Sequence, residues 1–329
     1  MIRWGLVGCG DVAEHKGGPG LIEADGSRLV AVASRDERRA ADFARRHGAQ
    51  RHYTTLEALL SDDEVDAVYV ATPPHVHAEQ TIACARAGKH ILCEKPMAMT
   101  DEQCDRMVRA AEDAGVQLMV AYYRRRYPAV VKIKELLEAG SIGRPTILRA
   151  QMAGRYQPPT DGARPWRTDP AVAGGGFLWD VGSHRIDLMI HFLGDVAEVS
   201  AFVDTVAFDL DVDDSAAVLL RYAAGGAQGV GIFHWNVARG GDEIEIGGTA
   251  GRIVCDMAVG CVRLTAESGD EQWMLPPPQI THRALVEDLV QAIDAGRANC
   301  LPGSEGAKTN AVLAAACRSS SEGRMIPLS

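Results

Sequence analysis

Short apolar runs alternate with longer amphipathic stretches along the N-terminal part of the chain. The runs that predict buried strands are Ile2–Val7, Arg28–Ala33, Val65–Val70, Ile91–Cys93 and Gln117–Ala121. Between them, apolar residues recur at every third or fourth position, which is the spacing of a helix that buries one face. Strands that alternate with helices form parallel sheets, so we predict a doubly wound parallel sheet of about six strand–helix units.

The pattern changes after residue 122. A helix is predicted over residues 129–139, and the segments that follow are strand-like, with glycine-marked turns between several of them. The predicted strands are Thr146–Gly154, Val196–Phe208, Ser215–Tyr222, Ala227–Trp235, Glu243–Ile246, Arg252–Asp256 and Cys261–Leu264, and the closing helices are Ala284–Ala295 and Gly306–Arg318. This spacing is typical of an open, mainly antiparallel sheet. We therefore predict two domains, residues 1–122 and 123–329.

A glycine-rich turn follows the first predicted strand directly. Gly8-Cys9-Gly10-Asp11-Val12-Ala13 has the G-x-G-x-x-A pattern, in which the first glycine allows a tight turn and the second lets a pyrophosphate approach the main chain. The amides at the start of the next helix then face the phosphates. We expect residues 17–20, Gly-Gly-Pro-Gly, to break or kink that helix.

The residues after the second strand bear on the choice of cofactor. An acidic side chain there binds the ribose hydroxyls of NAD, whereas an arginine accommodates the additional phosphate of NADP. Ser34, Arg35 and Arg39 favour NADP, and Asp36 would favour NAD if the register were shifted. The alternative is a capping box from Ser34 to Glu37 that begins a helix with solvated arginines. We predict NADP as the preferred cofactor, with NAD as the alternative.

Two further loops are expected at the carboxyl ends of strands, where open α/β sheets bind their ligands. One is Thr72-Pro73-Pro74-His75-Val76-His77, and the other is Glu94-Lys95-Pro96 after the apolar run that ends at Cys93. The alternative for the second loop is a solvated Glu–Lys pair at a strand edge. No carboxylate or cysteine near the two histidines completes a metal-ligand set, so we predict no metal site.

A second cluster of chemically active residues lies in the C-terminal half. Trp166-Arg167 precedes three glycines, Gly174–Gly176, and then Asp180, His184 and Asp187 follow. If Asp180 begins a helix, the three side chains share one face, and a carboxylate one turn from a histidine suits general acid–base chemistry. The alternative is a capping Asp180 and a histidine that belongs to the core.

Composition excludes several classes of partner. Apolar residues make up 47% of the 329 residues and charged residues 24%, as in globular proteins, and the net charge of −10 gives no basic surface for nucleic acid. No apolar run reaches the length of a membrane span, and the N-terminus reads as a strand rather than a signal peptide. Eight cysteines without zinc-like spacing indicate reduced thiols. We expect a cytoplasmic protein.

Taken in order, the glycine turn, the TPPHVH loop, CEKP, the WR pair and the GGG…DVGSH…D segment resemble the Gfo/Idh/MocA oxidoreductase family, named for glucose–fructose oxidoreductase and inositol dehydrogenase. The resemblance runs toward anhydrofructose reductases and dihydrodiol or xylose dehydrogenases. It implies a Rossmann domain followed by an open sheet domain, through which members associate as dimers or tetramers.

The resemblance also implies roles for individual residues. Lys95 and His184 would be the catalytic pair, with Asp180 beside them. The cofactor residues would be Gly8, Gly10, Asp11 and Val12 at the pyrophosphate, Thr72, Pro73, His75, His77 and Glu94 around the nicotinamide, Ser34 and Arg39 for NADP, and Trp166 and Arg167 as a further contacting pair.

These observations together predict an enzyme that transfers hydride between NAD(P) and a secondary alcohol or ketone of a sugar, polyol or related small molecule. His184 would take the hydroxyl proton, and Lys95 would polarise the same oxygen. One alternative is an NAD-dependent glycosidase of the same family. Another is a non-enzymatic sugar or nucleotide sensor, which would have no reason to retain both Lys95 and His184.

Overall fold

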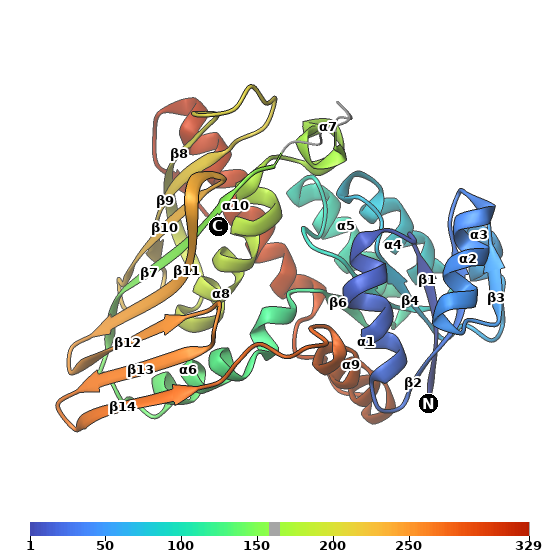
Figure 1. Cartoon of the computed structure of the whole chain (residues 1–329), viewed down its shortest axis with the longest axis horizontal. Coiled ribbons are helices and arrows are strands. Elements are labelled where there is room, and N and C mark those ends of the chain that lie inside the picture. The colour runs from blue at the N-terminus through green and yellow to red at the C-terminus, as the bar shows by residue number, and fades with distance from the viewer. Residues whose placement is uncertain (158–164, 329) are drawn as a thin grey trace. The chain divides into compact units, whose positions relative to one another are not determined.

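The computed structural model describes residues 1–157 and 165–328, and the chain forms two compact units (Figure 1). The first comprises Met1–Tyr123 and Gln279–Ala307, and the second comprises Arg124–Pro278 and Lys308–Ser329. Each unit is built around one sheet.

The first unit contains a six-stranded parallel sheet of order β3-β2-β1-β4-β5-β6, which confirms the predicted doubly wound sheet. The strands are β1 (Ile2–Val7), β2 (Ser27–Ala33), β3 (Arg51–Tyr53), β4 (Ala67–Val70), β5 (His90–Cys93) and β6 (Leu118–Val120). The helices are α1 (Gly18–Glu23), α2 (Glu37–His47), α3 (Leu56–Leu60), α4 (His77–Arg86), α5 (Asp101–Ala114) and α9 (Arg283–Ala295). Trp4 and Leu6 of the central strand are fully buried, as expected for a sheet covered on both faces.

The helix after the glycine turn is not broken at residues 17–20. Ala13–Gly17 is π-helical and leads directly into α1 at Gly18. Pro19 is the second residue of α1, directly after the π-helical turn, and the helix continues through it. Gly17 is needed for packing, because a Cβ there would overlap the ring of Tyr69 on β4.

The segment Gln279–Ala307 clusters with the first unit, whereas the sequence placed it in a second domain. Leu285 and Leu289 of α9 are fully buried, and the helix packs on α1 and β2. Helical periodicity indicates which residues are buried but not what covers them. The sequence therefore could not show that this segment packs in the first unit.

The second unit contains a nine-stranded sheet of order β14-β13-β12-β11-β7-β10-β9-β8-β15. Its strands are β7 (Pro145–Arg155), β8 (Val196–Asp204), β9 (Ser215–Tyr222), β10 (Gln228–His234), β11 (Asn236–Gly248), β12 (Gly251–Asp256), β13 (Cys261–Ala266), β14 (Gly269–Met274) and β15 (Ile326–Pro327). All neighbouring strands are antiparallel except β7 and β10, which confirms the predicted mainly antiparallel sheet.

Several strands of this sheet differ from their predicted extents, and β15 was not predicted. β14 was not predicted, because Gly269-Asp270-Glu271-Gln272 is polar and exposed and lacks the alternation of a half-buried strand. β8 ends at Asp204 rather than Phe208, since the N–H groups of residues 206–208 bind the carboxylate of Asp214 instead of a neighbouring strand. β11 is longer than the predicted Glu243–Ile246.

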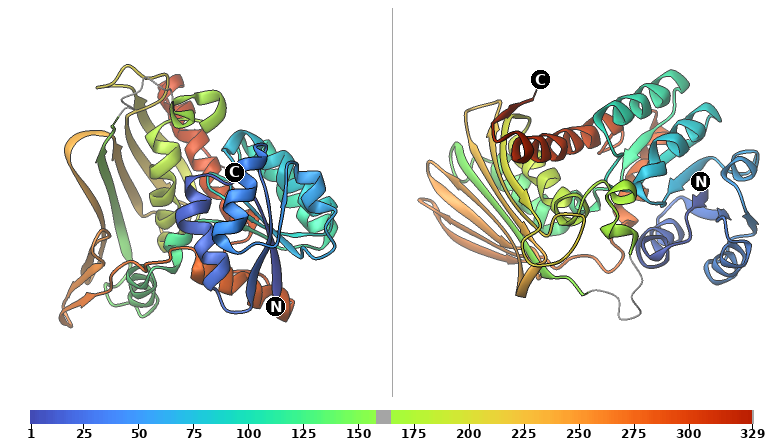
Figure 2. Two further views of the ribbon diagram at one scale, coloured as in Figure 1. Left: turned by 45° about the vertical axis from the view of Figure 1, so that its right-hand side comes forward. Right: turned by 90° about the horizontal axis from the view of Figure 1, so that it is seen from above.

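Helices α6 (Pro128–Glu138), α8 (Ser183–Leu193) and α10 (Gly303–Glu322, which begins in the first unit) cover one face of this sheet, and α7 (Pro170–Ala173) precedes α8 (Figures 1 and 2). The core lies beneath them and includes Leu148, Val218 and Phe233. On the opposite face Phe202 is 75% exposed and Leu219 is 56% exposed.

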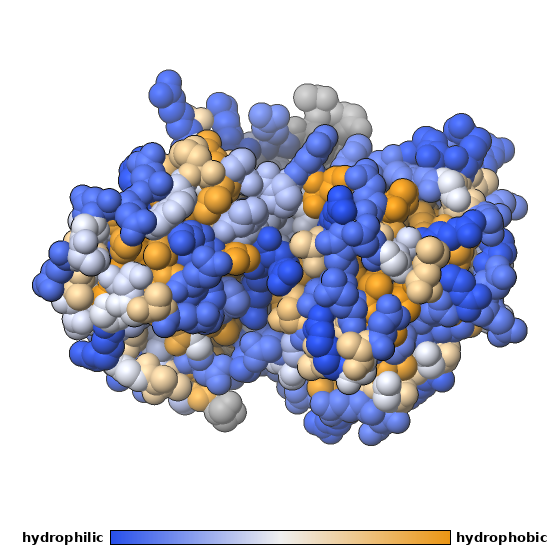
Figure 3. Space-filling model, turned by 90° about the horizontal axis from the view of Figure 1, so that it is seen from below, coloured by the Kyte–Doolittle hydropathy of each residue, from blue (hydrophilic) through white to orange (hydrophobic). Residues whose placement is uncertain are grey.

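Hydrophilic residues predominate on the face shown in Figure 3, with hydrophobic residues interspersed among them. Within residues 1–157 and 165–328, none of the helices combines the length and hydrophobicity that a membrane crossing requires.

Candidate functional site

The glycine turn after β1 is shaped by two glycines with different requirements. Gly8 has φ of 97°, and a Cβ there would lie 2.7 Å from the carbonyl oxygen of Ala71. Gly10 has the opposite environment, because no described atom lies within 4 Å of the position a Cβ would take. The first glycine permits the turn, and the second leaves its main chain open to a ligand.

The start of the helix that follows has the geometry of a pyrophosphate site. The helical hydrogen bonds begin with the N–H of Glu14, which donates to the carbonyl oxygen of Gly10 at 2.9 Å, so the preceding amides of the first turn lie at the glycine turn. The carboxylate of Asp11 is exposed and lies 3.6 Å from Nε2 of His15 on the next turn. The main chain of Asp11, rather than its carboxylate, therefore suits a phosphate.

After β2, Asp36 is the N-cap of α2. Its Oδ1 accepts the main-chain N–H of Arg39 at 3.2 Å, and the Oγ of Ser34 accepts the N–H of Asp36 at 3.4 Å. The alternative capping box from Ser34 to Glu37 is therefore wrong. The Asp36 carboxylate accepts a main-chain hydrogen bond at the start of the helix and is exposed to solvent there.

The arginines at this end of the sheet are exposed. Among the described residues, no carboxylate lies within ion-pair distance of the side chains of Arg35, Arg38 or Arg39. Burial raises the pKa of the Cys9 thiol to about 11, and the charge of Arg39 opposes that shift. The positive charge of Arg39 therefore acts at the glycine turn.

The end of β5 holds Glu94 and Lys95 in a defined arrangement. Glu94 is only 5% exposed, and its Oε1 accepts hydrogen bonds from the Tyr69 hydroxyl at 2.7 Å and from Nε2 of His282 at 2.8 Å. Its Oε2 accepts the main-chain N–H of Lys95 at 3.2 Å. The alternative of a solvated Glu–Lys pair is therefore wrong for Glu94.

Several groups act on the ionisation of Glu94. Burial raises the pKa of its carboxyl, but the hydrogen bonds from His282 and Tyr69 and the charge of Lys95 outweigh burial and lower the pKa to about 2. Glu94 is therefore a buried carboxylate that stays charged at neutral pH because of its partners.

The loops that follow β4 and β5 are joined by His77. This side chain is fully buried, with Nδ1 at 3.0 Å from the carbonyl oxygen of Pro96 and Nε2 at 2.7 Å from that of Thr72. Burial lowers its pKa. His75 is exposed instead. No group of three His, Cys, Asp or Glu side chains within the described ranges could hold a metal ion.

In the second unit, Asp213 shapes the three-glycine turn. Its carboxylate accepts the N–H groups of Gly176 at 2.7 Å and Leu178 at 2.8 Å, and a Cβ at Gly176 would overlap the Asp213 main chain. Burial raises the pKa of Asp213. The turn leads into a π-helix, Leu178–Gly182, and then into α8.

Asp180 lies within that π-helix and not at its start, so both the predicted helix start and the alternative capping role are wrong for this residue. Its Oδ2 lies 3.4 Å from Nε of Arg167, whose guanidinium in turn lies 4.5 Å from the centre of the Trp166 ring. The structure therefore brings together three of the residues singled out in the C-terminal half.

His184 is 4% exposed on the first turn of α8. Asp187, which the sequence placed on the same face, is fully buried and pairs with Arg125, whose Nη2 lies 2.8 Å from Oδ1. Asp187 therefore belongs to an internal ion pair. The structure places His184 and Asp180 in the second unit and Lys95 in the first. The first unit also holds the predicted cofactor residues Gly8, Gly10, Asp11, Val12, Ser34, Thr72 and Pro73.

Sequence reasoning missed two side chains that surround Glu94. Tyr69 lies inside a strand and has the sequence pattern of an ordinary core residue. His282 lies 188 residues after Glu94 in the chain. No local pattern marks a histidine before a helix as the partner of a distant carboxylate. Asp213 was also missed, although two adjacent aspartates before a strand were a weak signal for a buried polar turn.

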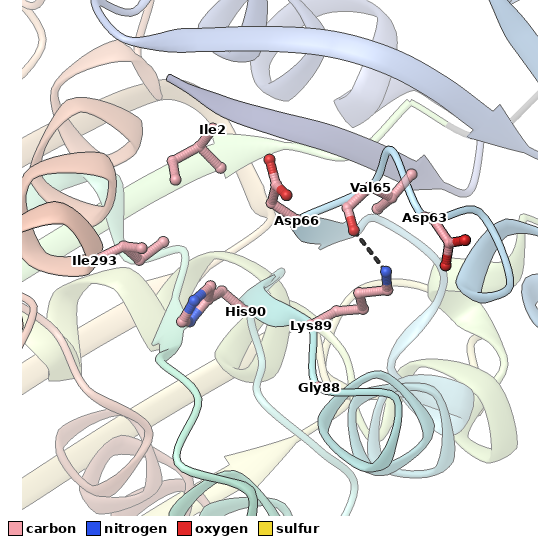
Figure 4. A pocket seen from close by; sticks show the side chains of 8 residues that line it. All are labelled: Ile2, Asp63, Val65, Asp66, Gly88, Lys89, His90 and Ile293. Atoms are coloured by element: carbon pink, nitrogen blue, oxygen red, sulfur yellow. Dashed lines mark hydrogen bonds between the residues drawn. The ribbon is translucent and has the colours of Figure 1, made fainter.

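A pocket of about 340 Å³ lies elsewhere on the first unit, at the amino ends of β1, β4 and β5 (Figure 4). Lys89 lines it and donates to the carbonyl oxygens of Val65 at 2.6 Å and Asp62 at 3.2 Å, and Asp66 pairs with Arg3. Parallel sheets bind ligands at the opposite, carboxyl edge. This pocket is therefore not the cofactor site.

Comparison with known proteins bears on the whole chain. Residues 2–122 match the family described as an oxidoreductase family with an NAD-binding Rossmann fold, and residues 130–254 match the GFO/IDH/MocA C-terminal domain. An oxidoreductase of Formosa agariphila is 32% identical over 323 residues, which cover 96% of this chain and 98% of that protein. A 1,5-anhydro-D-fructose reductase of Ensifer adhaerens is 35% identical over 293 residues, 87% of this chain and 86% of its own.

Among solved structures, that of levoglucosan dehydrogenase in complex with NADH has a TM-score of 0.91 and 26% identity, and the match covers 100% of this chain and 99% of that chain. The two matched family regions lie in the two halves of the chain, and both relatives match over most of its length. The chain belongs to the Gfo/Idh/MocA family of oxidoreductases.

Proposed function

We propose that the protein is an NAD(P)-dependent oxidoreductase that interconverts a secondary alcohol and a ketone on a sugar, polyol or related small molecule. The observation that carries this proposal is the arrangement at the carboxyl edge of the parallel sheet, where the open main chain at Gly10 follows β1 and the anchored Lys95 follows β5, with β4 between the two strands. Membership of the family and the sugar-directed names of relatives support the substrate class.

We assign the dinucleotide pyrophosphate to Gly8, Gly10 and the main chain of Asp11 and Val12. Thr72, Pro73 and His75 are proposed to lie near the nicotinamide, with His77 and Glu94 supporting these loops from within. Trp166 and Arg167 are also proposed to contact the cofactor. When bound, the nicotinamide supplies the acceptor or donor of hydride.

In the direction of oxidation, the substrate loses hydride from carbon and a proton from its hydroxyl group. His184 is proposed to take that proton, and the Lys95 ammonium to hold the same oxygen as it becomes a carbonyl oxygen. Asp180 is proposed to lie beside the reacting groups, with its carboxylate oriented by Arg167 at 3.4 Å. In reduction the proton moves from His184 to the carbonyl oxygen.

We propose further that NADP is preferred over NAD. Arg35 and Arg39 are exposed at the end of β2, and Ser34 adds a hydroxyl group there. Asp36 caps α2 through the N–H of Arg39, so its carboxylate is engaged at the start of the helix rather than offered to ribose hydroxyls. A 2′-phosphate offers the guanidinium groups charge-assisted hydrogen bonds that ribose hydroxyls do not.

Association through the second unit is also proposed. The uncovered sheet face carries Phe202 and Leu219 on adjacent strands, and large exposed apolar side chains on a sheet suit burial against a second copy as a dimer or tetramer. All eight cysteines are free thiols, which supports a reducing compartment such as the cytoplasm.

The function is tested by an initial-rate screen of sugars, polyols and their ketones with NADP and NAD, followed by the absorbance of the reduced nicotinamide. Net reduction or oxidation of at least one compound is expected. Hydrolysis of a glycoside without net redox change would instead identify the glycosidase, and ligand binding without any turnover would identify the sensor.

A further inference from the structure

A chain of polar groups inside the first unit ends at the main chain of Lys95. The Glu94 carboxylate binds the Tyr69 hydroxyl and Nε2 of His282 through Oε1, and the N–H of Lys95 through Oε2. Because an ionised carboxylate only accepts hydrogen bonds, Nε2 of His282 must carry the hydrogen. The hydroxyl of Thr281 lies 3.0 Å from Nδ1 and fixes the other side of the ring.

His282 is held in place on all sides. The side chain is fully buried, its ring centre lies 4.7 Å from that of Tyr123, and a Cβ at Gly20 would lie 2.8 Å from the Cβ of His282. The hydroxyl of Tyr123 in turn accepts a hydrogen bond from Nζ of Lys16 at 3.2 Å. The imidazole therefore has little freedom to leave Glu94.

We propose that His282 is a positioning residue for Lys95: its imidazole holds the Glu94 carboxylate charged and in place, and that carboxylate holds the main-chain N–H of Lys95. The inference rests on the proposed function, in which the Lys95 ammonium acts on the substrate oxygen. Residues that return to the first unit near the C-terminal end of the chain thereby help to build the catalytic edge of the sheet.

The charge of Glu94 depends on the groups that face it from each neighbouring element. These are Tyr69 on β4, Cys93 on β5, Lys95 after β5, His77 at the start of α4 and His282 before α9. Of these, only Lys95, His77 and His282 can be cationic, and burial lowers the pKa of His77. Removal of His282 leaves burial, which raises the pKa of Glu94, with fewer opposing groups.

The test compares His282→Leu with His282→Gln, whose side-chain amide keeps a donor near the Nε2 position. Arg283→Ala is the matched control, because this neighbouring residue is half exposed and pairs with Glu287 on the outside of α9. For each variant, kcat is measured against pH, and the dissociation constant of NADP is measured by fluorescence. Tyr69→Phe removes the other donor to Glu94 and serves if His282→Leu does not fold.

We expect kcat of His282→Leu to fall by about 10- to 100-fold, the loss that one hydrogen bond to a buried charge supports, while NADP affinity changes by less than about 3-fold. The acidic limb of the kcat profile should move to higher pH in His282→Leu and in Tyr69→Phe, and His282→Gln should recover most of kcat. Unchanged acidic limbs in both His282→Leu and Tyr69→Phe would overturn the proposal.

A thermal-unfolding cycle of His282→Leu and Glu94→Gln separates this inference from the proposed function, because it requires no substrate. Glu94→Gln should destabilise the wild type and be neutral or stabilising beside His282→Leu, where the charge has lost its partner. Additive effects would overturn the inference. Coupled unfolding in a protein with no redox activity would support the His282–Glu94 link and refute the proposed function instead.

Discussion

The cofactor preference can be changed by removing two exposed positive charges at the end of β2. Arg35 and Arg39 lie four residues apart, and neither guanidinium has a carboxylate within ion-pair distance in the described part of the chain. Both are therefore available to a 2′-phosphate. We consider Arg35→Ala, Arg39→Ala and the double variant, measured as the ratio of kcat/KM for NADP to that for NAD.

The magnitude follows from the chemistry of the contact and from its exposure. A hydrogen bond to a charged group contributes about 1.5–3 kcal/mol when it is protected from solvent. Screening at an exposed site reduces this toward the range of surface ion pairs, so we take about 1 kcal/mol for each arginine. Since about 1.4 kcal/mol is a factor of ten, each single variant should lower the ratio about 5-fold and the double variant about 30-fold.

The assay uses initial rates with each cofactor at a fixed, saturating substrate concentration. Arg38→Ala is the matched control, because Arg38 is equally exposed on α2 and has no assigned role. Its ratio should equal that of the wild type. A wild-type enzyme that favours NAD, or a double variant with an unchanged ratio, would refute the reasoning and leave these arginines as solvated helix residues.

His184→Ala should lower kcat by about 10²- to 10⁴-fold, the contribution typical of a general acid–base group, and should flatten the pH profile; full activity per folded molecule would show that His184 is only a core residue. Gly10→Ala should weaken NADP binding at least about 10-fold while thermal stability stays within about 1 kcal/mol, because the added methyl group fills open space that the phosphate needs. Gly8→Ala should instead destabilise the protein by more than about 1 kcal/mol, since φ is positive and Ala71 is too close, and equal stability of the two variants would contradict this geometry.

Five strands of the first unit were predictable because each is a short, continuous apolar run followed by a helical pattern, whereas β3 is short and mainly polar and was not predicted. The glycine turn was also predictable, since Gly8 and Gly10 lie where a strand meets a helix. The role of each glycine there depends on the local main-chain geometry alone. Local sequence also gave Lys95 its place at the end of β5.

The parts that could not be predicted depend on contacts between distant segments. His282 acts on Glu94 from 188 residues away, and α9 buries its apolar face against α1 and β2 rather than in the second unit. The sequence allowed Asp36 to be a ribose ligand of NAD, and only the hydrogen bond from the N–H of Arg39 identifies it as the cap of α2. Asp187 was grouped with His184 by helical spacing, but its partner Arg125 lies outside that helix.

The central claim is that Lys95, held at the end of β5 by the Glu94 carboxylate, acts on the substrate oxygen during hydride transfer. The most direct measurement is turnover of Lys95→Met with the best substrate from the screen, together with its NADP dissociation constant. The account predicts that turnover is abolished and that NADP affinity stays within about 3-fold of the wild type, because the lysine is assigned to substrate rather than to phosphate. Wild-type-like turnover in this variant would contradict the account.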